Sequence, residues 1–497
     1  MPRDLGRVSG SSLPWFAIIP YLGLGAALLA VSFYFYNDSR AFFLAVFFGY
    51  FIYGIGLAVA FLVLAAGGLA RTRPPAPAPG GDDLAFTVTV AVPAHDEADV
   101  VVEAVRSLLG QSLAPAEIIV VNDGSTDDTL VYLIEAFDLQ PSSRAPGLHA
   151  STHGIRGILQ SRRFPTLWVI DKQNAGKAAA LNTAHRFSAG SLFVTADADC
   201  LFLPDALARA VRYFHDSPDV VAAGGIVVAA NGLDQQSLLK GATSLPRGLV
   251  AQLQFIEYAT GFIWRFAWAR LNSLMLLSGG FSVFRSGALR AVGGFDEDIL
   301  TEDYEIAYRL HEHCRRNGDD YRILMLPDPV AYTLVPETLG SLIEQRTRWF
   351  QGFLQTLTKY RHMVFDRQFG WFGVFALPIK AIDAVMPFWG LFTYVALADH
   401  LAFGHFPVPL ELLLGLVAIR WGADIAVNWM LIWMHRRHVA PRMTGRQYAI
   451  MMALAPLNMW LQRLIWYAYG FRAYWRLWQR EQRWVKAERR AFGAGSA

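Results

Sequence analysis

Of the 497 residues, 54% are hydrophobic and 17% are charged. Soluble domains average about a quarter charged residues, so this balance predicts a membrane protein. The net charge of +3 is too small to indicate nucleic acid as a partner. The two cysteines, Cys200 and Cys314, are too few for a disulfide framework and fit a reducing compartment.

The chain opens with two uncharged apolar runs, residues 13–36 and 41–70. Each is long enough to cross the ~30 Å hydrocarbon layer as a helix, so we expect two transmembrane helices within residues 1–71. Arginines before the first run and after the second predict that both ends face the cytoplasm. A cleaved signal peptide is disfavoured because the first run is too long and a second span follows at once. The proline-rich residues 72–84 form an extended linker.

Residues 85–336 alternate short β-branched runs with helical patterns. Because helical segments separate most of these runs, we expect a Rossmann-like α/β domain with a mostly parallel sheet. Residues 140–164, rich in Pro, Gly, Ser and Arg, are expected to be a loop insertion. The five expected strands are residues 86–93, 117–122, 166–171, 191–196 and 220–230.

Apolar character returns in the last third of the chain. Residues 337–368 carry an amphipathic helical pattern, and residues 369–471 are expected to form further transmembrane or interfacial helices. The apolar runs within this region are residues 382–401, 410–434 and 448–471.

The run over 448–471 is expected not to cross the membrane. It contains Pro456 and Arg463, and basic segments flank it at residues 435–446 and 472–497. Basic segments favour the cytoplasmic side, and one full crossing cannot join two segments on the same side. The basic, aromatic tail, residues 472–497, reads either as a helix lying in the membrane surface or as a helix packed on the α/β domain.

Polar residues follow three of the expected strands, in the sequences VPAHDE, VNDGSTDD and DADC. The carboxyl ends of parallel strands open on one sheet edge, where ligands bind. Asp123 suits either a turn-and-cap role or the binding of a nucleobase. Asp197 and Asp199 are hard oxygen ligands that suit Mg²⁺ or Mn²⁺ carrying substrate phosphates; solvated turn acids are the alternative.

The sequence QNAGKAAALN places Lys177 at a helix start, where it suits a phosphate contact. It is not a P-loop, because Asp171 stands at the first glycine position and Ala178 follows the lysine. No GxGxxG follows a strand, so a nicotinamide cofactor is not expected.

The stretch DILTEDYEIAYRL places acids around Thr301 at the start of a helical pattern. Acids favour a helix N-terminus, so Glu302, Asp303 and Glu305 alone indicate a helix start. One of them is also a candidate general base. The helix dipole would lower the pKa of that carboxyl, so burial or neighbouring acids would have to raise it.

Five motifs occur in order: VNDGSTDD, NAGK, DADC, TEDYE and QRTRW. Together with the flanking apolar runs, they resemble the membrane-embedded family 2 glycosyltransferases, the processive synthases of cellulose, hyaluronan, chitin and poly-N-acetylglucosamine. The resemblance covers about residues 88–352. It implies a GT-A catalytic domain, inserted between transmembrane segments, that uses a UDP-sugar.

The resemblance also implies donor-side roles. Asp123 would hold the uracil, Lys177 the diphosphate, and Asp197 and Asp199 the metal and nucleotide. Asn122 stands where the family more often has Asp. HDE (residues 95–97) replaces the usual Tyr-Asn-Glu, a departure that bears on the contacts to the nucleobase and not on the reaction.

On the acceptor side, Asp303 matches the general base of the family. Gln345, Arg348 and Trp349 match the Gln-x-x-Arg-Trp motif, which lies at the acceptor end and contacts the diphosphate. SGGFSVFR (residues 278–285) matches the stretch that lines the acceptor site.

We therefore expect an inverting, processive β-glycosyltransferase that polymerises UDP-N-acetylglucosamine or UDP-glucose, with Mg²⁺ or Mn²⁺ as cofactor. The exopolysaccharide would pass through the protein's own helices in the inner membrane, with the catalytic domain in the cytoplasm. Accessory or secretion subunits would supply any cyclic-di-GMP control. The alternatives are a single-addition enzyme with a lipid acceptor and a non-catalytic receptor on the same scaffold.

Overall fold

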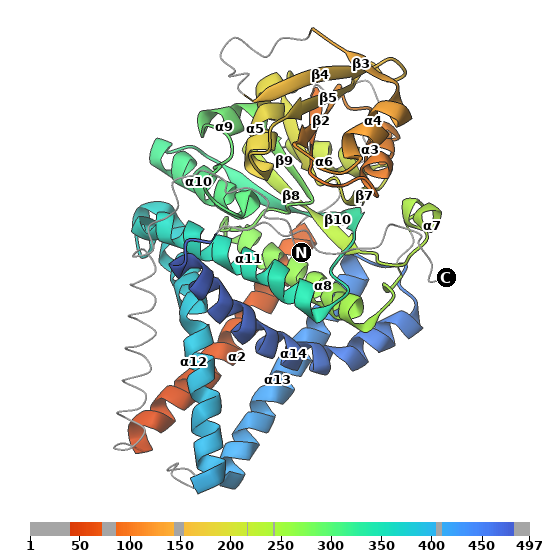
Figure 1. Ribbon diagram of the computed structural model, residues 1–497. Coiled ribbons are helices and arrows are strands. Elements are labelled where there is room, and N and C mark those ends of the chain that lie inside the picture. Colours follow the sequence, from red (N-terminus) through yellow and green to blue (C-terminus); the bar gives the residue numbers. More distant parts are fainter. Residues whose placement is uncertain are drawn as a thin grey trace.

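The computed structural model describes residues 40–71, 86–143, 154–215, 217–241, 244–403 and 410–481. The expected first span over 13–36 lies outside the described residues, as do the linker over 72–84 and most of the tail over 472–497. An α/β domain stands at one end of the molecule, and long helices extend from the other (Figure 1).

A single ten-stranded sheet forms the α/β domain, in the order β3-β4-β5-β2-β1-β6-β9-β8-β10-β7. All five strands expected from the sequence are confirmed. They are β1 (Val88–Ala94), β2 (Glu117–Asp123), β5 (Leu167–Lys172), β6 (Leu192–Ala196) and β8 (Val220–Ala229). The others are β3 (Leu139–Pro141), β4 (Ile155–Ser161), β7 (Cys200–Phe202), β9 (Phe281–Arg285) and β10 (Arg322–Thr333).

The expectation of a mostly parallel sheet is wrong, because the sheet is mixed. β1 pairs in parallel with β2 and β6, β2 with β5, and β8 with β10, but the other five pairings are antiparallel. β9 enters between β6 and β8 with Phe281 opposite Ala196, at the carboxyl end of β6. The chain thus re-enters the sheet from that edge without crossing its face, which makes the pairing antiparallel.

The expected loop insertion over 140–164 is also wrong in part. β3 and β4 form an antiparallel pair at the sheet edge, and β4 continues the sheet against β5. β4 is mostly half-buried and carries polar residues on both faces, so it lacks the continuous apolar run that marked the central strands. Residues 144–153 lie outside the described residues.

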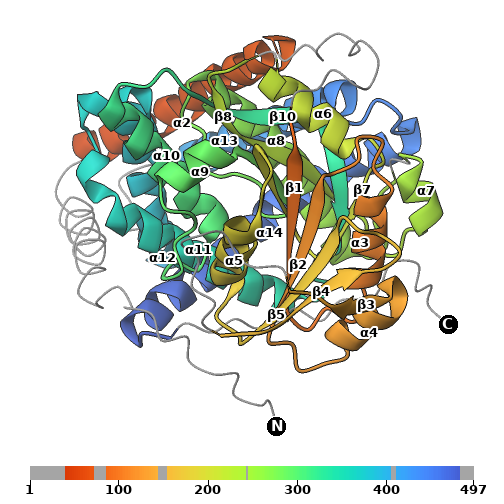
Figure 2. The ribbon, with the colours of Figure 1, turned by 90° about the horizontal axis from the view of Figure 1, so that it is seen from above.

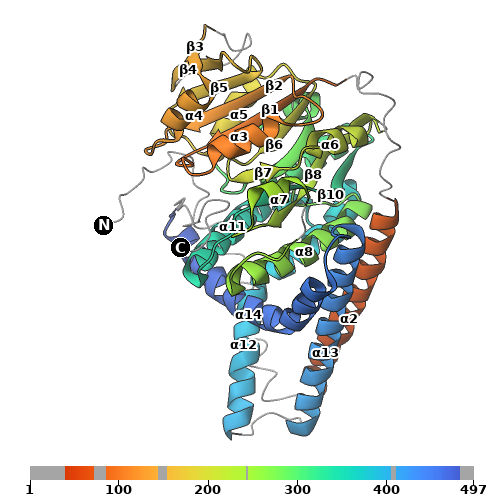
Figure 3. The same cartoon turned by 90° about the vertical axis from the view of Figure 1, so that its right-hand side faces the viewer.

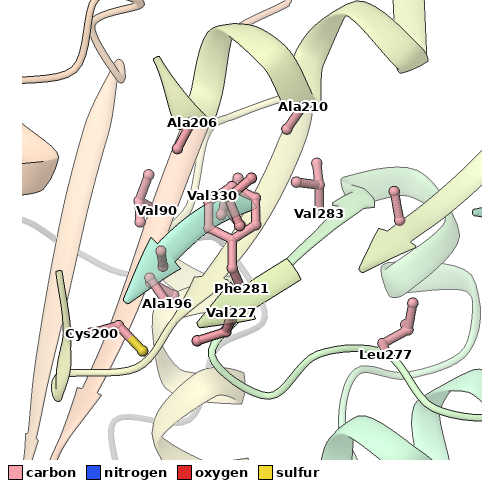
Figure 4. Packing of buried hydrophobic residues seen from close by; sticks show 14 of the residues in the cluster. Val90, Ala196, Cys200, Ala206, Ala210, Val227, Leu277, Phe281, Val283 and Val330 are labelled. Atoms are coloured by element: carbon pink, nitrogen blue, oxygen red, sulfur yellow. The ribbon is translucent and has the colours of Figure 1, made fainter. Parts of the chain in front are cut away.

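Helices cover both faces of the sheet (Figure 2). α5 (Lys177–Phe187) packs on β1 and β2, while α6 (Ala206–His215) packs on β8 and β10. Ala206 and Ala210 of α6 lie above Phe281 and Val330, and these small residues let the helix approach the sheet closely (Figure 4). The remaining helices of the domain are α3 (Val101–Leu109), α4 (Thr129–Phe137), α7 (Gln235–Leu239), α9 (Ser286–Ala291) and α10 (Glu302–Asn317).

A second group of helices lies beneath the sheet edge (Figure 3). α2, α12 and α13 extend away from the α/β domain, whereas α14 runs crosswise to α12 and α13 beneath it (Figures 1 and 3). Their bounds are α2 (Arg40–Arg71), α8 (Leu249–Arg270), α11 (Leu339–Lys359), α12 (Leu377–Phe403), α13 (Leu410–His438) and α14 (Gly445–Trp478).

One helical stretch among the described residues, Phe372–Leu391, is long and apolar enough to cross a membrane. It begins before the expected run over 382–401 and overlaps its first half. The expected runs over 41–70 and 410–434 lie within α2 and α13, and the run expected to be interfacial forms the crosswise α14.

Candidate active site

A cavity of about 1140 Å³ opens where the carboxyl ends of β1, β2 and β6 meet the helices beneath the sheet. Strand ends form one side, and α8, α10 and α11 form the other. Every residue proposed from the sequence lines this cavity: Asp123, Lys177, Asp197, Asp199, Asp303, Gln345, Arg348 and Trp349.

Asp123 ends β2 with only 3% of its surface exposed. Its carboxylate accepts hydrogen bonds from the backbone amides of Ala175 (3.0 Å) and Gly176 (2.7 Å) and pairs with Lys172 at 2.5 Å. The carboxylate therefore fixes the loop that leads into α5. Lys172 escaped the sequence interpretation, although it lies directly opposite Asp123 in the β2–β5 register.

Lys177 is the first residue of α5 and follows Gly176, whose positive φ of 94° favours glycine. Its Nζ forms ion pairs with Asp197 Oδ1 at 2.7 Å and Glu302 Oε1 at 2.8 Å. Burial opposes its charge, but these carboxylates and Asp303 together raise the pKa of Lys177 above its usual value. Glu302, which the sequence indicated only as an acid beside Asp303 at the helix start, is therefore also a residue of the site.

Asp197 and Asp199 lie in the turn after β6, and both line the cavity. The Asp197 amide donates to the Gly280 carbonyl at 3.3 Å, which fixes this turn against the start of β9. Two carboxylates at a cavity wall fit the oxygen-ligand preference of Mg²⁺ or Mn²⁺. Within the described residues, no group of three or more His, Cys, Asp or Glu side chains is arranged to hold a metal ion.

Asp303 is the second residue of α10, and its carboxylate lies against Gly279. Burial, and next the negative charge of Glu302, raise the pKa of Asp303 to about 7. These effects exceed the lowering expected from Lys177 and the helix N-terminus. Thr301 occupies the N-cap position but makes no capping hydrogen bond, because its side chain packs against Gly352 of α11.

Gln345, Arg348 and Trp349 lie on α11 and face the cavity. Burial lowers the pKa of Arg348, although Glu302, Asp197 and Asp303 oppose this effect. Trp349 is 37% exposed.

Arg346, which lies between Gln345 and Arg348, was not proposed from the sequence. It donates to Gln345 Oε1 at 2.6 Å and pairs with Glu257 of α8 at 2.8 Å. Its guanidinium also stacks over Trp349 at 4.1 Å. Arg346 therefore holds the α11 motif in place against α8.

Two family matches cover the α/β domain and reach into α11. Residues 147–352 match the family described as glycosyltransferase like family 2, and residues 89–147 match glycosyl transferase family 2. Together these matches span residues 89–352 of the 497-residue chain.

Curated relatives include poly-beta-1,6-N-acetyl-D-glucosamine synthases. That of Staphylococcus epidermidis is 28% identical over 267 residues, 53% of this chain and 54% of that protein. That of Staphylococcus aureus is 28% identical over 276 residues, 55% of this chain and 56% of that protein. The chain thus matches about half the length of these relatives.

A mannosyltransferase from Pyrobaculum calidifontis, solved in complex with GDP-Man and Mn²⁺, shares the fold. Its TM-score is 0.51 at 22% sequence identity, and the match covers 83% of this chain and 98% of that chain. This likeness confirms the expected GT-A fold of the α/β domain.

The buried pair of Asp123 and Lys172 yields a prediction for stability. Asp123→Asn leaves the buried lysine without its counter-charge, which destabilises proteins by about 3–5 kcal/mol. We expect a clearly lower midpoint of thermal unfolding in detergent. Asp99→Asn, at an exposed position, is the control; equal midpoints for the two variants would contradict the anchoring role of Asp123.

Proposed function

The chain belongs to glycosyltransferase family 2, and we propose that it is a processive, inverting synthase that polymerises a UDP-sugar into a polysaccharide. The observation that carries the proposal is that one cavity brings together Lys177 and Arg348, the two acids Asp197 and Asp199, and Asp303. Cations and metal-ligating acids suit a diphosphate leaving group, and a carboxylate whose pKa is raised suits a base.

In this proposal the donor diphosphate binds beside Lys177 and Arg348. Asp197 and Asp199 would hold Mg²⁺ or Mn²⁺, and the bound ion would supply positive charge for the departing diphosphate. The Asp123 carboxylate already accepts two backbone amides and Lys172, so it acts mainly by shaping the nucleobase end of the cavity. His95 lines that end as well.

Asp303 deprotonates the acceptor hydroxyl, which then attacks the sugar from the side opposite the leaving group. At pH 8 a carboxyl with a pKa of about 7 is mostly ionised and is a stronger base than an ordinary aspartate. Glu302 neutralises part of the charge on Lys177, so the lysine does not hold Asp303 fully ionised at low pH.

Aromatic rings surround the acceptor end of the cavity and support a saccharide acceptor, because sugar rings stack on aromatic faces. They come from α8, α10, α11 and α14, so the cavity reaches the helices beneath the sheet. The rings are Tyr258, Phe262, Tyr304, Trp349, Phe350, Phe353 and Tyr469.

We extend the proposal to the membrane. α2, α12 and α13 are the proposed spans, α14 is interfacial, and the α/β domain faces the cytoplasm at the inner membrane. The direction of α14 across the other helices and the apolar stretch Phe372–Leu391 support this arrangement. The polymer would leave between the helices that line the cavity.

For the donor, the relatives named poly-beta-1,6-N-acetyl-D-glucosamine synthase favour UDP-N-acetylglucosamine over UDP-glucose. The test is a screen of UDP-sugars with purified full chain and Mn²⁺, with mass analysis of products. We expect UDP release that EDTA stops and a ladder of oligosaccharides. A product with a single sugar added to a lipid would reject processive synthesis in favour of the single-addition alternative. Absence of UDP release with every donor would reject the proposal that the chain is an enzyme.

A first prediction concerns the base. Asp303→Asn keeps the shape of the side chain but removes its proton affinity, so transfer should fall about a hundredfold or more. UDP affinity should stay within about twofold, measured by calorimetry. Asp320→Asn, at an exposed position in the loop after α10, should transfer normally. Near wild-type turnover in Asp303→Asn would remove this residue from the role.

A second prediction concerns pH. The base acts in its ionised form, so the transfer rate should fall as pH drops through about 7. If the base had the pKa of an ordinary aspartate, the transfer rate would not change between pH 9 and about pH 5. The measurement is the transfer rate at saturating donor from pH 5 to 9; a flat profile from pH 5.5 upward would contradict the burial of the base.

A third prediction concerns Gly279. A Cβ there would lie 2.9 Å from Asp303 Oδ2 and 3.5 Å from Lys177 Nζ, so the acid must move. Gly279→Ala should slow transfer about tenfold to a hundredfold, because small displacements of a base are costly. Gly287→Ala, where an added Cβ meets no atom within 4 Å, is the control. Equal rates in both variants would show that this close approach has no role.

A further inference from the structure

Arg265 is a cation of the cavity that none of the sequence motifs includes. It lies on α8, and Glu257, Gly261 and Arg265, spaced four residues apart, all line the cavity. This spacing places them on one helix face. Arg265 therefore stands at the end of that face nearest the C-terminus of α8.

The guanidinium of Arg265 is held in place without being neutralised. It stacks over the Phe262 ring at 4.5 Å, and its Nη1 is buried with no hydrogen-bond partner among the described residues. Burial lowers the pKa of Arg265 to about 10, while Asp303 and Tyr258 oppose the shift. The side chain thus remains charged at neutral pH, and a buried donor without a partner is costly.

Three other cations at or next to the cavity each form an ion pair with a carboxylate. The pairs are Lys172 with Asp123, Lys177 with Asp197 and Glu302, and Arg346 with Glu257. A ligand that brings oxygen atoms to Arg265 would satisfy its remaining hydrogen-bonding capacity.

The electrostatic neighbours of Arg265 place it at the acceptor end. Arg348 interacts with Glu302, Asp197 and Asp303, which include the acids on the donor side. Arg265 interacts with Asp303 and with the aromatic Tyr258. The two arginines reach the cavity from different helices, Arg265 from α8 and Arg348 from α11.

We propose that Arg265 orients the acceptor: its guanidinium donates hydrogen bonds to oxygens of the same sugar residue whose hydroxyl Asp303 deprotonates. The inference rests on the proposed function. A planar guanidinium can donate two parallel hydrogen bonds and so fixes the direction of a ligand, which an ammonium cannot do.

The test separates transfer to a sugar from hydrolysis, in which water replaces the acceptor. UDP release is measured with the full chain, its active donor and Mn²⁺, with and without a short oligosaccharide of the transferred sugar. Arg265→Met keeps a side chain over Phe262 but loses the donors, and Arg265→Lys keeps the charge but loses the fork. Arg270→Met, at the exposed end of the same helix, is the matched control.

We expect Arg265→Met to raise the acceptor KM or lower acceptor-stimulated release about tenfold or more, the effect of losing charged hydrogen bonds. Arg265→Lys should show a smaller loss of the same kind. Hydrolysis and the donor KM should stay within about twofold of wild type, as should all rates of Arg270→Met.

Three results would overturn the inference. A raised donor KM would show that Arg265 contacts the donor. An equal loss of hydrolysis and transfer would show a structural role, and unchanged acceptor kinetics would show that Arg265 has no role in acceptor binding. If the Arg265→Met variant does not fold, the same kinetic measurements on Arg265→Lys decide between these outcomes. These failures differ from failure of the proposed function, in which the wild-type chain itself releases no UDP with any donor.

Discussion

The ion pairs of Lys177 with Asp197 and Glu302 are the interaction on which the site depends. One ammonium joins the start of α5, the turn after β6 and the start of α10, three elements far apart in sequence. Because Glu302 faces the lysine, its neighbour Asp303 is left against Gly279 in an environment that raises its pKa to about 7. The same three-way contact thus fixes Lys177 at the proposed donor end and leaves Asp303 as a carboxyl with a raised pKa.

The mixed sheet makes this contact geometrically available. β9 returns from the cavity edge, antiparallel to β6, so Gly279, which precedes it, crosses the edge beside Lys177 and Asp303. A Cβ on Gly279 would displace the Asp303 carboxylate. On the opposite wall, Arg346 binds α8 through Glu257 and stacks on Trp349, which fixes the helix that carries the Gln-x-x-Arg-Trp motif. Rigid neighbours therefore support both ends of the proposed reaction.

Much of this could be predicted from the sequence, for identifiable reasons. The central strands are continuous apolar runs, and acids after parallel strands gather at one sheet edge; Asp123, Asp197 and Asp199 do line one cavity there. Strand direction has no such signature, which is why the antiparallel pairing of β9 was missed. The edge strand β4 was missed because polar residues on both of its faces interrupt the apolar run. Arg265 and Lys172 escaped because tertiary packing alone brings them to the site.

The most direct test of the account is a cryo-electron microscopy structure of the full chain in lipid nanodiscs with UDP and Mn²⁺. We predict the metal between Asp197, Asp199 and the diphosphate, with Lys177 and Arg348 on the phosphates and Asp303 facing the space beyond them. UDP bound elsewhere, or bound in this cavity with its diphosphate away from Lys177, would contradict the central claim.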